Sequence, residues 1–275
     1  MSSLTDLIAH QKTWAADHGL APDENAYLSA IEKNLFQTLS ERTRQSFIDG
    51  SGGELVDSPK GPAKMKALYS SSALAVNVFD FWVTHDKTAL SKAMYLDDEI
   101  VSISFEGKFP TGLRGTPPNL DIVLALSTGH VVGIESKFSE WLRPKSASEK
   151  PFAASYFRGN IRLWEKNGLP NTQILAQDIA AGKESFRYLN VAQLLKHSLG
   201  LSNRLGRNFS LHYMYYDWPG IESTHHKLEL VKFADLVGAE LKFHASSYQD
   251  FFRSLLMIDG AEADYLSYLG DRYFN

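Results

Sequence analysis

The feature that most constrains the fold is a pair of apolar segments separated by a three-residue turn. Residues 120–126 and 130–138 are rich in valine, isoleucine and leucine, and only three residues, ending in Gly129, lie between them. Runs of this length and composition are typical of β-strands. A three-residue loop ending in glycine is typical of a hairpin, because glycine readily adopts the left-handed conformation required there. The sequence therefore predicts an antiparallel hairpin over residues 120–138.

The register of this hairpin predicts a cluster of charged side chains on one face. If Leu126 pairs with His130, Asp121 lies opposite Glu135 with both side chains on the same face. Lys137 points to that face as well, because side chains alternate along a strand. Opposed carboxylates repel one another, and a divalent cation such as Mg²⁺, which prefers oxygen ligands, would remove that repulsion. The alternative is a structural ion pair in which Lys137 bridges the two acids.

The residues of the hairpin also indicate a reaction. With Asp121 and Glu135 as metal ligands, the metal would act as Lewis acid and template for hydrolysis of a phosphodiester. Lys137 would orient or deprotonate the attacking water and offset the charge that develops on the phosphorane.

The segments Pro118 to Asp121 and Glu135 to Lys137 resemble the two halves of the PD-(D/E)XK nuclease signature. Here Asn119 and Leu120 separate the proline from the aspartate, whereas the signature has proline directly before it. The resemblance implies a restriction-endonuclease-like α/β fold, with an αβββαβ core over residues 70–216 and a mixed central sheet flanked by helices. It also implies an endonuclease that acts on DNA and depends on Mg²⁺ or Mn²⁺.

Further acids are candidates for the same site. Many members of that family carry a glutamate on the first core helix, where this chain offers only Asp80. Glu106 follows the alternating strand pattern of residues 101–105 and is our candidate for a third metal ligand; the alternative is an exposed residue at a strand end. Glu140 can order a metal-bound water, or it can simply complement the dipole of a following helix.

The charge distribution suggests where a nucleic acid would bind. The net charge of the chain is −4, yet residues 140–217 contain eleven lysines and arginines against six acids, a local excess of +5. We expect DNA to bind over this region, although a solvated helix surface gives the same pattern. The candidate substrate-binding residues are Arg158, Arg162, Gln193 and Lys196. Gln193 and Lys196 share one face of a predicted helix, for which an exposed helix face is the alternative.

The remaining segments predict a single domain of 275 residues. Apolar spacing predicts helices over 4–18, 24–48, 70–84, 153–164, 171–181, 188–199 and 248–258, and strands over 101–105 and 209–216. A segment rich in glycine and proline, residues 49–63, predicts a loop. We divide the domain into an N-terminal helical layer with its loop (1–62), a nuclease core (63–218) and a C-terminal extension (219–275).

The composition excludes several classes of protein. The chain has no cysteine, which excludes disulfides and zinc–thiolate sites and suits a reducing compartment, so we predict a cytoplasmic protein. No apolar run approaches the length of a membrane span, and no P-loop, dinucleotide-binding or zinc-protease motif is present. A homodimer remains open. The alternative function is a catalytically inactive nuclease fold that binds nucleic acid or acts as a scaffold.

Overall fold

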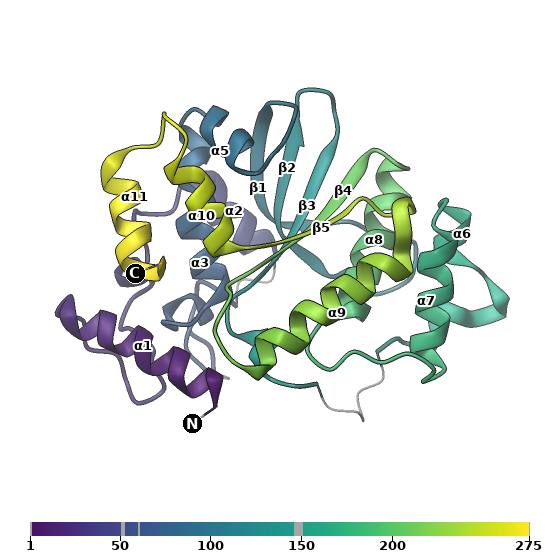
Figure 1. The fold of residues 1–275 in the computed structure, drawn as a ribbon, viewed down its shortest axis with the longest axis horizontal. Coiled ribbons are helices and arrows are strands. Elements are labelled where there is room, and N and C mark those ends of the chain that lie inside the picture. Colours follow the sequence, from purple (N-terminus) through teal and green to yellow (C-terminus); the bar gives the residue numbers. More distant parts are fainter. Residues whose placement is uncertain (1, 51–52, 60, 146–150, 275) are drawn as a thin grey trace.

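A five-stranded mixed sheet forms the centre of the computed structural model, which describes residues 2–50, 53–59, 61–145 and 151–274. The strands follow their sequence order across the sheet (Figure 1). They are β1 (Ile100–Lys108), β2 (Asn119–Leu126), β3 (Val131–Lys137), β4 (Phe209–Tyr215) and β5 (Phe243–Ser247). β1, β2 and β3 pair antiparallel, whereas β3, β4 and β5 pair parallel.

Helices cover the sheet and build the two ends of the chain. The α-helices are α1 (Ser3–Asp17), α2 (Glu41–Gly50), α3 (Ser71–Phe79), α4 (Phe81–Thr84), α5 (Thr88–Ala93), α6 (Leu163–Lys166), α7 (Pro170–Ala180), α8 (Val191–Leu205), α9 (Ile221–Val237), α10 (Tyr248–Leu256) and α11 (Ala263–Leu269). Short 3₁₀ segments lie at Ile31–Asn34, Lys64–Lys66, Glu140–Leu142, Ala154–Asn160 and Gly238–Glu240, and a π-helical turn at Gly270–Phe274.

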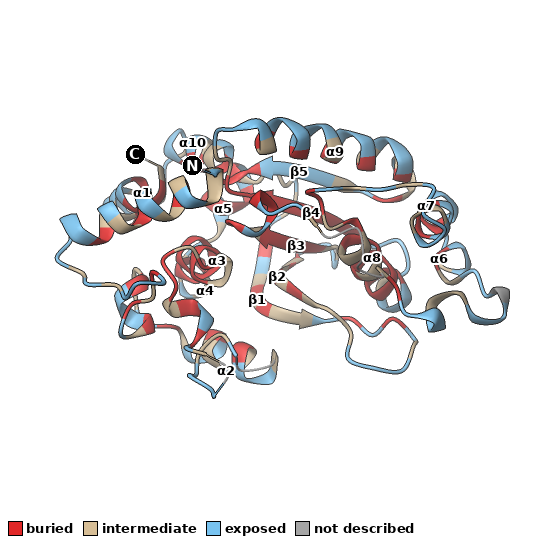
Figure 2. Ribbon diagram, turned by 90° about the horizontal axis from the view of Figure 1, so that it is seen from below, coloured by how far each residue is buried: buried red, intermediate tan, exposed pale blue. Residues whose placement is uncertain are grey.

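The parallel half of the sheet determines where the helices lie. The connection from β3 to β4 contains α8, and the connection from β4 to β5 contains α9. Both connections cross over in the same direction along the sheet, and because such crossovers are right-handed, both helices lie on the same face. α3 contacts β2 and β3, while α10 contacts both β5 and α5. Figure 2 shows buried residues concentrated in β3, β4, α3 and α8. All seven residues of β4 are buried, so the inner strands lie within the core.

The fold confirms the predicted restriction-endonuclease-like α/β class and most of its core elements. The hairpin forms, and Gly129 has a φ of 80°, as its place at the end of the turn requires. The helix predicted over 70–84 forms as α3 and α4, and the Ser70 side chain accepts a hydrogen bond from the backbone N–H of Ala73 at its start. The division into segments at residues 62 and 218 stays a prediction.

The helix predicted over residues 24–48 was wrong in its first half. Only a 3₁₀ turn at Ile31–Asn34 and α2 are helical there. The Asn34 amide donates hydrogen bonds to the carbonyls of Met65 and Ala67, so side-chain bonds hold this segment against the 3₁₀ turn at Lys64–Lys66. Its apolar residues are buried without a helix, which shows that helical spacing alone did not determine the backbone.

The single helix predicted over 153–164 was also wrong. A 3₁₀ segment is interrupted at Arg158 and Gly159, and the glycine has a φ of 69°; α6 begins only at Leu163. The predicted loop over 49–63 is shortened because α2 extends to Gly50, and Ser51, Gly52 and Lys60 lie outside the described residues.

Two elements of the fold, β5 and α9, were not predicted from the sequence. β5 adds a second parallel pair, so the sheet has two antiparallel and two parallel pairs. β5 is short, and the residues from His244 to Ser246 are exposed, which leaves no apolar run to reveal it. α9 was missed because Leu228 and Val231 are exposed and obscure its helical period.

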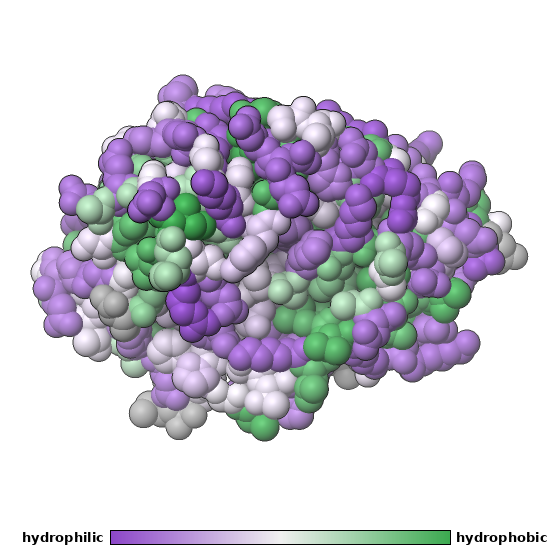
Figure 3. All heavy atoms as spheres, turned by 45° about the horizontal axis from the view of Figure 1, so that its top comes forward, coloured by the Kyte–Doolittle hydropathy of each residue, from purple (hydrophilic) through white to green (hydrophobic). Residues whose placement is uncertain are grey.

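The outer surface combines polar residues with separate apolar patches. Figure 3 shows hydrophilic residues over most of one face, with apolar side chains gathered in patches between them. Among the described residues, no helix has both the length and the apolar character needed to cross a membrane.

Candidate active site

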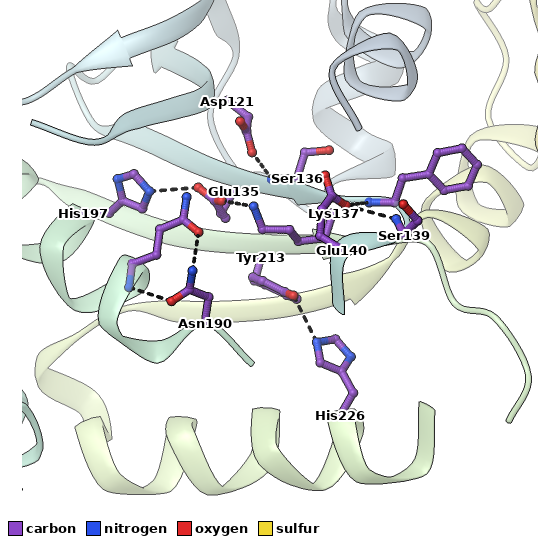
Figure 4. Close-up of polar contacts among 12 residues, drawn as sticks. Asp121, Glu135, Ser136, Lys137, Ser139, Glu140, Asn190, His197, Tyr213 and His226 are labelled. Atoms are coloured by element: carbon purple, nitrogen blue, oxygen red, sulfur yellow. Dashed lines mark hydrogen bonds and ion pairs between the residues drawn. The ribbon is translucent and has the colours of Figure 1, made fainter. Parts of the chain in front are cut away.

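The catalytic candidates lie where β2 and β3 begin to separate. The predicted register is confirmed through four residue pairs, ending at Ile122 with Ile134, one residue before Asp121 and Glu135. Asp121 does not continue the ladder. Its Oδ2 accepts a hydrogen bond of 2.7 Å from the backbone N–H of Ser136 (Figure 4). The side chain of Asp121 is thereby held beside β3, close to the charged residues of that strand.

Glu135 is the most enclosed member of the cluster. Its side chain is fully buried, and its two oxygens have different neighbours. Oε1 forms an ion pair with Nζ of Lys137, while Oε2 lies 2.8 Å from Nε2 of His197 on α8 (Figure 4). His197 is itself buried. No local sequence pattern connects it to Glu135, because the helix that carries it follows a long connection.

The charges of the cluster are unevenly compensated. Burial and the charge of Glu135 hold the pKa of Asp121 well above its ordinary value. Burial alone would raise the pKa of Glu135, but the charges of Lys137 and His197 outweigh it and lower this pKa to about 2. Burial opposes the charge on Lys137, yet Glu135, Asp121 and Glu140 raise the lysine pKa above its usual range. Among the described residues, no cation lies within ion-pair distance of Asp121, whereas Glu135 has Lys137 and His197 beside it.

Asp121 faces a cleft of about 530 Å³ that also contains three glutamates. Glu106 and Glu140 were candidates from the sequence, whereas Glu54 was missed. Glu54 accepts a 2.6 Å hydrogen bond from the Ser72 hydroxyl and forms a 2.8 Å ion pair with Lys64. Because Glu54 lies in the glycine-rich segment before α3, with no periodic pattern around it, nothing in the sequence indicated its place.

Glu106 lies in the cleft in an unusual backbone conformation. Its φ is 52°, a left-handed value that is rare for residues other than glycine. Its Oε2 accepts a 2.6 Å hydrogen bond from the Asn119 side chain. Burial raises the pKa of Glu106 and the charge of Glu54 adds to this, while Asn119 opposes it. A role as a metal ligand stays a prediction for this residue.

A model of the family described as "Restriction Endonuclease associating with ARP" matches residues 6–274. The chain belongs to this family. The description indicates a nuclease-type function and DNA as the substrate class. No curated protein and no solved structure matches the chain.

The donors at this candidate site suit a metal that needs few protein ligands. In the described part of the chain, no three histidine, aspartate or glutamate side chains gather closely enough to hold a metal ion by themselves. Mg²⁺ commonly uses one or two carboxylates and completes its shell with water and substrate phosphates. The uncompensated charge near Asp121 fits this chemistry. Glu140 is engaged locally, since its side chain accepts the backbone N–H groups of Phe138 and Ser139.

The predicted substrate-binding residues divide into two pairs. Gln193 and Lys196 line one cleft of about 690 Å³, which Pro118 of the segment before β2 also lines. Arg158 and Arg162 do not line it; Arg158 is exposed, and Arg162 forms an ion pair with Glu165. A homodimer and a cytoplasmic location stay predictions for this member of the family.

Lys196 stands out among these four residues. Its Nζ lies 5.5 Å from the ring centroid of Phe152 and 5.9 Å from that of Tyr156. No carboxylate of the described residues lies within ion-pair distance of it, and burial lowers its pKa. A negatively charged ligand, such as a phosphate, would therefore stabilise the charged form of Lys196.

Proposed function

We propose that the protein is a Mg²⁺- or Mn²⁺-dependent DNA endonuclease of the PD-(D/E)XK type. The observation that carries the proposal is the cluster at the end of the hairpin, where Asp121 and Glu135 are drawn together beside Lys137 with one carboxylate lacking a cation. A purely structural ion-pair cluster would be expected to balance its charges. The membership of a restriction-endonuclease family supports the same function.

Each residue has a distinct proposed role. Asp121 and Glu135 would hold the metal, with Glu106 as a further candidate. The bound metal would supply Lewis-acid activation of the phosphodiester and of a water molecule. Lys137 forms an ion pair with Glu135 in this cluster. We assign it the orientation or deprotonation of the attacking water and the stabilisation of negative charge on the phosphate.

The cleft beside the hairpin supports a path for the nucleic acid. Gln193 and Lys196 lie there, and Lys196 has no carboxylate partner among the described residues. We propose that the backbone phosphates of DNA pass this cleft and bring the scissile group to Asp121. Arg158 and Arg162 would contact phosphates farther along. The family description also names an association with ARP, which we extend to this chain as a proposal.

The decisive experiment is a cleavage assay in Mg²⁺ or Mn²⁺ with plasmid, linear duplex, single-stranded DNA and RNA as substrates. We expect the parent protein to cleave DNA and Glu135→Ala to be inactive. Lys137→Met should bind Mn²⁺ like the parent in calorimetry but lose turnover, because lysine is not a ligand. If parent and Glu135→Ala behave alike on all substrates, the nuclease proposal fails and the inactive scaffold becomes the better account.

A further inference from the structure

One neighbour of Glu135 comes from outside the hairpin. Lys137 is on the same strand, but His197 is supplied by α8, and its side chain is only 1% exposed. The contact therefore depends on the tertiary packing of α8, not on the motif itself. The contact joins Glu135, a candidate metal ligand, to α8, which lies outside the PD-(D/E)XK motif.

The contact joins two buried polar atoms that have no hydrogen-bond partner among the described residues. Oε2 of Glu135 and Nε2 of His197 lie 2.8 Å apart, within ion-pair distance. Within the described residues, neither atom makes a hydrogen bond elsewhere, although both are buried. A buried polar atom without a partner is costly, so each of these groups restrains the position of the other.

The two neighbours of Glu135 differ in how freely they can move. Lys137 has a long flexible side chain that is 14% exposed. His197 lies among buried α8 residues, and the indole N–H of Trp164 donates a 2.7 Å hydrogen bond to the carbonyl of Leu195 in the same helix. We therefore expect an arriving cation to displace Lys137 from Oε1 more readily than His197 from Oε2.

We propose that His197 is a positioning residue that orients Glu135 for metal binding. By engaging Oε2 it turns Oε1 toward Lys137, so that one oxygen remains available when the lysine moves away. This inference rests on the proposed metal-dependent function. Residues that support ligands in this way usually change metal affinity about 10- to 100-fold when removed.

The test compares His197→Leu with His197→Gln by Mn²⁺ calorimetry and thermal unfolding of the metal-free protein. Leucine removes the polar contact, while glutamine can place an amide N–H near the position of Nε2. We expect Mn²⁺ affinity to fall about 10-fold or more in His197→Leu and to be substantially recovered in His197→Gln. His212→Leu is the matched control, because His212 is also buried but projects from β4 toward His244. It should bind Mn²⁺ like the parent.

The outcomes separate this inference from the proposed function. If the parent binds no Mn²⁺, the metal-dependent function fails and the inference fails with it. If the parent binds and His197→Leu, still folded, binds equally well, only the positioning role is overturned. If both His197 variants lose affinity together with a cooperative thermal transition that His212→Leu retains, His197 is structural and the inference is again overturned.

Discussion

A buried carboxylate, Asp80, and a half-buried one, Asp121, are compensated in opposite ways. Asp80, between α3 and α4, accepts hydrogen bonds from the Ser40 hydroxyl at 2.9 Å, the Ser40 backbone N–H at 3.2 Å and the Thr43 hydroxyl. Asp121 accepts one from Ser136 and is close enough to Glu135 for their charges to interact. The first acid is surrounded by donors that stabilise its charge. The second is placed against another acid, an arrangement that stabilises the fold only once a cation arrives.

The largest expected effect comes from Asp121→Asn. Cleavage should fall by about 100-fold or more, because a ligand carboxylate is lost. Stability should be unchanged or higher at neutral pH, since a raised pKa means that the fold favours the uncharged side chain, and asparagine is always uncharged. Cleavage rates and urea unfolding at pH 7 measure the two effects. A strongly destabilised variant would show that the charge of Asp121 supports the fold, and the contrast with Asp80 would disappear.

Asp80→Ala should have the opposite effects: a loss of stability and no change in metal affinity. It leaves the donors of Ser40 and Thr43 unpaired in the interior, so we expect a loss of about 3 kcal/mol in the free energy of unfolding. The Mn²⁺ affinity of the folded variant should equal that of the parent. Calorimetry at a temperature well below the transition checks this, and a large change in affinity would mean that Asp80 belongs to the metal site after all.

A smaller effect on stability is expected at His212, a buried histidine with no carboxylate of the described residues within ion-pair distance. Burial, with the nearby His244 and His130, lowers its pKa to about 3, whereas an unfolded histidine titrates near about 6.5. Between these values the unfolded chain binds the extra proton, so stability falls as the pH falls. His212→Phe should reduce this slope by about 1.4 kcal/mol per pH unit. Urea unfolding at pH 4.5 and pH 5.5, both between the two pKa values, gives the slope, and an unchanged slope would contradict the assignment.

The smallest effect is expected from Lys196→Gln, which removes a cation that has no carboxylate partner among the described residues. DNA affinity measured in Ca²⁺ should fall modestly, and the slope of log affinity against log salt should become shallower by about 1. Arg162→Gln is the comparison, since its guanidinium is already paired with Glu165 and should affect the slope less. Equal slopes for parent and Lys196→Gln would remove the cleft from the proposed DNA path.

The sequence predicted the parts of the site that local geometry determines. The three-residue turn set the register, and alternation along β3 brought Glu135 and Lys137 to one side. His197 and Glu54 could not be predicted in this way, because their places depend on how α8 and the segment before α3 pack against the sheet. The same limit applies to α9 and β5, whose exposed residues hide the hydrophobic period on which the prediction depended.

The two contacts of Ser136 affect when, during synthesis and folding, the candidate site can form. The Ser136 backbone N–H binds Asp121, and the Ser136 hydroxyl lies 2.6 Å from the hydroxyl of Tyr248, 112 residues later in the chain. Contacts between such distant residues require a large loop to close and tend to form late. A growing chain that ends just after β3 would carry both candidate ligands without the helices that hold Glu135 and Ser136 in place. Organisation of the site is thereby deferred until nearly the whole chain has been made and folded.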